Sequence, residues 1–101
     1  MSLAFVSTKR VREHVRKRGV YFDDLMYAIQ NFFLARNYAD EIKYVRFVLR
    51  DEVEPDKIIR RSLVVNVCAD ALSDEIKNEL EKMLTDKFPT LHVFVRLSCE
   101  E

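Results

Sequence analysis

The side chains that could perform catalysis are few, and the strand pattern brings only one pair of them together. Cys68 and His92 have the same parity in two predicted strands, so both would point to one face of a sheet. A thiol beside an imidazole can act as a nucleophile activated by a general base. The sequence supplies no third group to orient the histidine and no oxyanion hole. We therefore predict no catalytic residue.

The carboxylates and the second histidine do not indicate a metal site or an acid–base pair. Asp23–Asp24 and Asp74–Glu75 begin predicted helices, where negative charge stabilises the positive end of the helix dipole. The neighbours in Asp51–Glu52 would point to opposite faces of a strand. His14 lies among cationic residues, which disfavour a bound cation. We predict a protein that is not an enzyme and that has no metal and no cofactor.

The composition excludes several classes of protein. The chain has 101 residues, which suits one domain over 1–101, and it has one glycine, Gly19. Phosphate-binding and dinucleotide-binding loops need several glycines, so both are excluded. No apolar run approaches the roughly 18 residues of a membrane-spanning helix. Cys68 and Cys99 lack metal-ligand spacing, so we interpret them as reduced, small apolar residues of a cytoplasmic protein that does not contact a membrane.

Charge is distributed unevenly along the chain. The 17 Lys and Arg residues balance the 17 Asp and Glu residues, but the segment 8–19 carries six cations and only one acid, Glu13. A helix over about 8–18 is predicted, because Ser7 or Thr8 can cap its start and Gly19 suits its end. One interpretation places this helix at the periphery of the domain, where it binds a polyanion. Its candidate binding residues are Lys9, Arg10, Arg12, Arg16, Lys17 and Arg18.

Three predicted strands, at 42–53, 58–69 and 91–97, have two faces that differ in kind. In each strand one parity is almost purely aliphatic, and the other mixes arginines, aromatics and small polar groups. The segment 54–57, with Pro55 at a favourable position, predicts a turn that joins the first two strands into an antiparallel hairpin. Residues 3–6 are a further candidate strand.

Two more helices complete the predicted elements. Asp23 is the expected N-cap of a helix over 24–36, and Asp70 or Ser73 caps a helix that Phe88–Pro89 ends. The helix over 24–36 is apolar on nearly every side, which is typical of a helix buried on two sides. In so small a domain, this pattern indicates contact with a second subunit through Phe33.

The predicted order of elements is (β)ααββαβ. This order favours an α+β fold in the form of a small two-layer sandwich, ferredoxin-like or a variant of it. The sheet would be antiparallel with the helices on one face. The aliphatic parity of the strands would contact the helices, and the mixed parity would stay open.

The open side of the sheet is therefore where we expect function, and its residues favour binding over chemistry. In the first interpretation it joins two copies of the chain as a non-catalytic homodimeric interaction module. In the alternative, aromatics stack bases and arginines bind phosphates of a nucleic acid. A plain solvated face is the third possibility, and no small-molecule ligand is predicted. The self-association candidates are Tyr44, Val48, Val64, His92 and Phe94, and the arginines Arg46, Arg50 and Arg96 join the polyanion-binding candidates.

Overall fold

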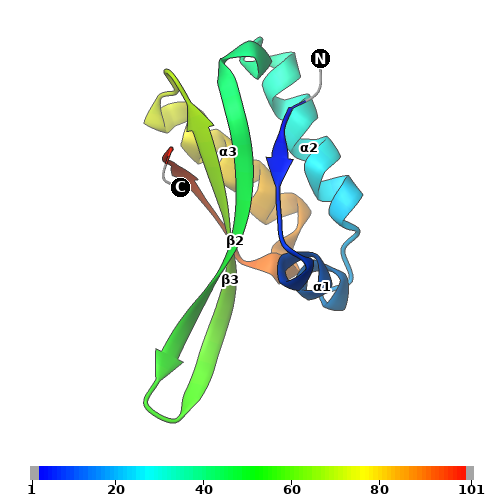
Figure 1. The fold of residues 1–101 in the computed structure, drawn as a ribbon, viewed down its shortest axis with the longest axis vertical. Coiled ribbons are helices and arrows are strands. Elements are labelled where there is room, and N and C mark those ends of the chain that lie inside the picture. The colour runs from blue at the N-terminus through cyan, green and yellow to red at the C-terminus, as the bar shows by residue number, and fades with distance from the viewer. Residues whose placement is uncertain (1–2, 100–101) are drawn as a thin grey trace.

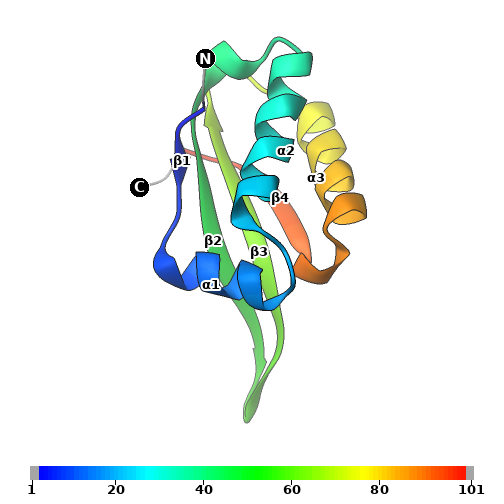
Figure 2. The ribbon, with the colours of Figure 1, turned by 90° about the vertical axis from the view of Figure 1, so that its right-hand side faces the viewer.

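Three α-helices and a four-stranded mixed sheet make up the described part of the chain, residues 3–99 (Figures 1 and 2). The structure is a computed structural model, and at Ile59 it describes the backbone only. The predicted α+β class is confirmed. In chain order the elements are β1 (Phe5–Val6), α1 (Lys9–Lys17), α2 (Phe22–Ala35), the 3-10 helix η1 (Ala39–Glu41), β2 (Ile42–Glu54), β3 (Lys57–Ala69), α3 (Asp74–Lys87), the 3-10 helix η2 (Pro89–Leu91) and β4 (Val93–Leu97).

The strands lie side by side in the order β1-β2-β3-β4, which corrects the predicted topology. Only β2 and β3 are antiparallel, whereas β1 is parallel to β2 and β4 is parallel to β3. In a split βαβ unit a further strand separates the two strands that the helix joins. Here each helical crossover joins direct neighbours. The sheet is therefore mixed rather than antiparallel, and the ferredoxin-like strand order is not found.

The helices cover one face of the sheet and leave the other face open (Figure 2). The core between the layers contains the aliphatic parity of the strands, for example Val45, Val65 and Val95, together with Leu25 and Leu84 from the helices. This segregation of faces agrees with the prediction from strand alternation. Burial of these side chains is the main source of stability, at about 25 cal/mol per Å² of apolar surface removed from water.

Several helix ends agree with the prediction because the capping residues act as expected. Thr8 Oγ1 accepts a hydrogen bond from the Val11 backbone N–H at 3.2 Å, and Ser73 Oγ accepts one from Ile76 at 3.3 Å. Gly19 follows α1 with a φ of 79°, and Asn37 follows α2 with a φ of 59°. Both adopt the left-handed conformation that ends a helix, which glycine and asparagine tolerate better than other residues.

Helix α2 differs from the prediction in its start and in its surroundings. It begins at Phe22 after the N-cap Tyr21, so Asp23 lies in the first turn and is not the N-cap. The Phe22 ring packs edge-on against Phe47 at 4.8 Å between centroids, which favours the earlier start. Phe33, predicted to contact a second subunit, is only 1% exposed and belongs to the core of the protomer.

Helix α1 is part of the core layer and does not lie at the periphery. Val11, His14 and Val15 are buried on its inner side. The remaining positions of the helix are five cations and the acid Glu13, and all of them are exposed. Two valines four residues apart thus suffice to pack one side of this short helix against the core.

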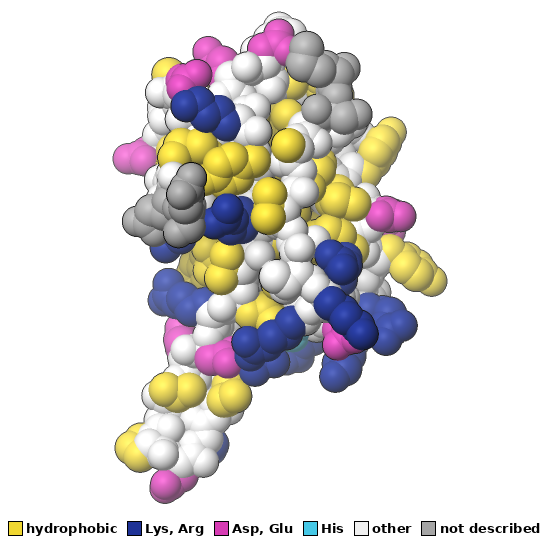
Figure 3. Space-filling view, viewed as in Figure 1, with side chains coloured by type: hydrophobic (Ala, Val, Ile, Leu, Met, Phe, Trp, Pro, Cys, Tyr) yellow, Lys and Arg dark blue, Asp and Glu magenta, His cyan; other side chains and the backbone are white. Residues whose placement is uncertain are grey.

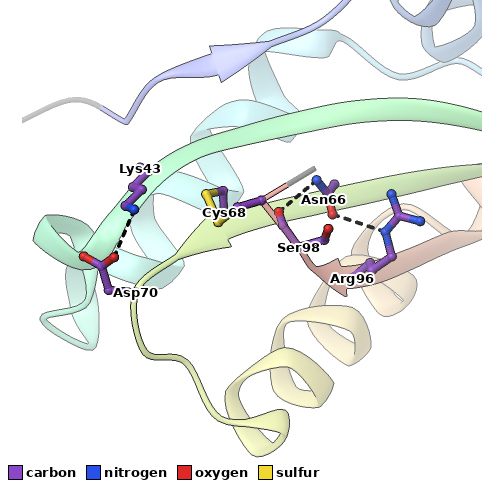
Figure 4. Close-up of a disulfide and its surroundings, with 7 residues drawn as sticks. Lys43, Asn66, Cys68, Asp70, Arg96 and Ser98 are labelled. Carbon is purple, nitrogen blue, oxygen red and sulfur yellow. Dashed lines mark hydrogen bonds and ion pairs between the residues drawn. A yellow bond between two sulfur atoms is a disulfide. The ribbon is translucent and has the colours of Figure 1, made fainter. Parts of the chain in front are cut away.

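Cys68 and Cys99 form a disulfide, so the prediction of two reduced cysteines is wrong in this structure (Figure 4). The bond joins the end of β3 to the segment after β4, and Cys68 is buried there. Cross-linking residues this far apart stabilises a fold mainly by restricting the unfolded chain. Disulfides persist chiefly in oxidising environments, so the predicted cytoplasmic location loses the support that reduced thiols would have given it.

The β2–β3 hairpin extends well beyond the strands that flank it (Figure 1). β1 pairs only with Val45 and Arg46, and pairing with β4 begins at Leu63. Residues 50–62 thus form a two-stranded projection, which we call the arm. Its tip exposes Val53 and Ile58, which are cross-strand neighbours with 67% and 53% of their surfaces accessible. Two-stranded hairpins alone are marginally stable in water, so the arm has less support than the rest of the sheet.

Neighbouring residues of β4 should tolerate charge very differently. Val95→Glu places a carboxylate among core residues, where Val95 is 5% exposed, and we expect a loss of more than about 4 kcal/mol, enough to prevent folding. Phe94→Glu changes a side chain that is 38% exposed on the opposite face, and the fold should survive. Circular dichroism and urea unfolding of both variants test this. Comparable loss of stability in the two variants would contradict the assignment of faces.

Candidate polyanion-binding face

The side of the sheet without helices, called the open face, is built from aligned rows of side chains. The register places Asn66 between Arg46 and Arg96, and Val64 between Val48 and Phe94. Further rows pair Tyr44 with Cys68 and Arg50 with Ser62. Alternation in three adjacent strands therefore gathers the predicted arginines and aromatics on one surface.

On this face the side chains of β3 are small and buried, and those of β2 and β4 are larger. Ser62, Asn66 and Cys68 are each 1% exposed, and Val64 is 7% exposed. Larger side chains from β2 and β4 stand on both sides of them. On the open face, the side chains of the neighbouring strands therefore cover β3. Val64, predicted to contact a second copy, is buried within the protomer and offers little surface to any partner.

Two arginines of β2 lie against aromatic rings. The Arg46 guanidinium carbon is 5.3 Å from the centre of the Tyr44 ring, and that of Arg50 is 5.6 Å from the centre of the Phe94 ring. The second pair spans β3 from one side to the other, which helps to bury Val64 and Ser62 beneath it. Such cation–π contacts contribute about 0.5–1 kcal/mol each at exposed sites and hold the guanidinium near the ring.

A third arginine is oriented by a polar network at the end of β4 (Figure 4). Arg96 Nε donates a hydrogen bond to Asn66 Oδ1 at 3.2 Å, and Asn66 Nδ2 donates to the Ser98 carbonyl at 3.1 Å. The Cys68–Cys99 disulfide lies next to this network and fixes the segment that contains Ser98. The buried amide of Asn66 thus has partners for both of its ends, as buried polar groups require.

Helix α1 meets the sheet at the foot of the arm through a charged cluster. Arg61 binds Asp51 with two hydrogen bonds, at 2.6 and 3.0 Å, and Arg10 of α1 lies 3.9 Å from the same carboxylate. The hydrogen bond from Arg61 is the main cause that lowers the pKa of Asp51. Burial, followed by the charges of Arg18 and Arg61, lowers the pKa of His14. His14 is therefore neutral at pH 7.

A groove connects the basic helix with the open face. It has a volume of about 270 Å³ and lies where the chain leaves β1 to enter α1. Arg10 from α1 and Arg46 from the open face both line it, together with apolar side chains. Figure 3 shows Lys and Arg side chains gathered across the width of the molecule just above the arm. Basic side chains therefore extend from α1 to the open face, with acidic side chains such as Asp51 among them.

The predicted Cys–His pair is not brought together. His92 precedes β4 next to Ser62, and Cys68 lies six residues further along β3, about 20 Å away at strand spacing. Cys68 is also held in the disulfide. His92 is exposed and adopts a φ of 49°, at the end of η2. In the described part of the chain, no three His, Cys, Asp or Glu residues are grouped so that they could hold a metal ion.

Comparisons with known proteins do not extend this description. No protein-family model, no curated protein and no solved structure matches the chain. Within residues 3–99, no helix is both long enough and apolar enough to cross a membrane. Function is therefore inferred from the surface of the molecule.

The charged cluster beneath α1 should make stability fall on acidification. Because the pKa of folded His14 lies below its ordinary value near 6.5, the unfolded chain binds a proton that the folded chain resists. The free energy of unfolding should therefore decrease as the pH falls below about 6.5. A further decrease should follow below about pH 4, where unfolded Asp51 binds a proton more readily than folded Asp51.

Urea unfolding at pH 7.5 and pH 5.5 measures the first decrease. His14→Leu should reduce it, whereas His92→Asn, which suits the left-handed conformation at that position, should leave it intact. An equal decrease in the wild type and in His14→Leu would rule out this role of His14.

Proposed function

We propose that this protein is a non-catalytic binding module that binds single-stranded nucleic acid on its open face, assisted by the cations of α1. The observation that carries the proposal is the pair of arginine–aromatic contacts on one exposed sheet surface. Arg46 with Tyr44 and Arg50 with Phe94 offer a stacking surface and a phosphate partner at each of two places. Single-strand binders combine these two elements.

The shape of the open face suits an extended strand. The small side chains of β3 are covered by their neighbours, so an extended strand would lie on the exposed side chains of β2 and β4. Tyr44 and Phe94 lie four rungs apart along β3, about 13 Å at strand spacing. The two rings therefore suit different bases of one strand.

Charge favours an anionic partner on this face over a second copy of the chain. A symmetry mate placed face to face would bring two sets of Arg46, Arg50 and Arg96 together, and like charges repel. The apolar gain would be small because Val48 and Phe94 are each only 38% exposed and Val64 is buried. Phosphates would instead neutralise the arginines and release counterions.

The predictions about catalysis, cofactors, location and membrane contact are kept with this proposal. The predictions that the protein is not an enzyme and needs no cofactor belong to this proposal, and within residues 3–99 Cys68 and His92 are held apart. A cytoplasmic location and the absence of a membrane contact remain predictions. The disulfide makes an oxidising environment the more favourable one for the folded state.

Fluorescence anisotropy with labelled single-stranded and duplex oligonucleotides of equal length tests the proposal. We expect tighter binding to the single strand, and binding that weakens steeply with salt. Phe94→Ala should weaken binding about tenfold or more, because stacking contributes about 1–3 kcal/mol per base. Arg96→Gln should lower the slope of log affinity against log salt by about 0.7, the effect of one phosphate contact on a single strand.

Matched controls lie away from the open face. Tyr27→Ala removes an exposed aromatic of α2, and Lys82→Gln removes an exposed cation of α3. Both should bind like the wild type. Absence of binding at low salt would exclude the function. Equal binding to duplex that Phe94→Ala does not affect would assign binding to α1 and exclude the open face.

A further inference from the structure

The outer edge of β2 is unpaired along much of its length. Beyond Arg46, this edge has no strand partner within residues 3–99, because β1 ends at Val6. The groove described above lies beside it and has an apolar lining that includes Val6, Val11 and Leu49. An exposed strand edge next to an apolar groove is a template for another strand.

Along this edge, basic residues come before acidic ones in the chain. Arg46 and Arg50 come first, and Glu52 and Glu54 follow toward the tip of the arm. All four have the same parity and alternate with residues of the other face. When such a strand pairs antiparallel with a copy of itself, its basic half lies beside the acidic half of the partner. The edge is therefore complementary to itself in charge.

We infer that two copies of this chain associate edge to edge, with β2 antiparallel to β2 around a two-fold axis next to Asp51. This register places Arg50 opposite Glu52 of the partner subunit, and it does so twice by symmetry. Cross-strand pairs of opposite charge stabilise a sheet, whereas like charges destabilise it. The carboxylate at the axis, Asp51, is already neutralised by Arg61 and Arg10 within its own protomer.

The same register covers the exposed apolar part of the arm. Leu49 lies opposite Val53 of the partner subunit, whose side chain would enter the groove beside Val11. In a single copy Val53 is 67% exposed, so burial there removes apolar surface from water. Each arm would lie along the body of the other copy, which supplies the contact that an isolated hairpin lacks.

The pairing has a geometric consequence for the open face. A two-fold axis perpendicular to the sheet keeps both open faces on the same side, because residues that face each other in an antiparallel pair point the same way. The two four-stranded sheets then form one continuous surface. This dimer uses an edge rather than the open face or Phe33, and it leaves the open face accessible.

Light scattering after size exclusion at micromolar concentration tests the inference. We expect a mass of about twice the 12.0 kDa of one chain. Glu52→Arg should give a monomer, because two arginines would then face each other at each symmetric position. The double variant Arg50→Glu with Glu52→Arg restores opposite charges, so the dimer should return. Glu75→Arg, on α3 away from this edge, should remain dimeric.

Thermal unfolding of each variant separates loss of association from loss of fold, which matters because Glu52 also lies opposite Arg60 within the hairpin. A monomeric wild type would overturn the inference, and so would a double variant that folds but stays monomeric. Neither result depends on nucleic acid. A monomer that still binds single strands refutes only the dimer, and a dimer that binds none refutes only the proposed function.

Discussion

The antiparallel pairing of β2 with β3 is the constraint on which the rest of the structure depends. These strands have 13 residues each, and the two remaining strands attach one to each of them. Both helical crossovers therefore begin or end on this hairpin. A slip of one residue in its register would turn the core valines outward and Arg46 and Arg50 inward. The register of this hairpin thus determines both which side chains form the core and which form the open face.

The two faces of the sheet could be predicted, but the order of its strands could not. Alternation with a period of two follows from the pleat alone, and it is the same beside a parallel neighbour as beside an antiparallel one. One feature of the sequence indicated that β3 lies between two other strands. Its residues on the open face are small or medium in size, and larger side chains of both neighbouring strands can cover them: Ser62, Val64, Asn66 and Cys68.

Other features depend on contacts between segments far apart in sequence. Cys68 and Cys99 have no spacing that predicts a bond, and they meet only because β4 pairs with β3. Apolar composition marked the helix over 24–36 as deeply buried, but composition does not distinguish a core from an interface. Phe33 therefore looked available to a partner, whereas the sheet and its own helix layer already enclose it.

The zero net charge of the chain conceals an uneven distribution of charge over its surface. The cations of α1 continue into the arginines of the open face, and this charge can be neutralised by phosphates along its length. The carboxylates Glu52 and Glu54 lie at the tip of the arm, away from most of those cations in the same copy. Within one copy Glu52 lies opposite Arg60, and pairing with another copy would also place it opposite Arg50 of the partner subunit. Such pairing would also partly neutralise the arginines, so a dimer should hold nucleic acid with fewer phosphate contacts per chain than the arginine count implies.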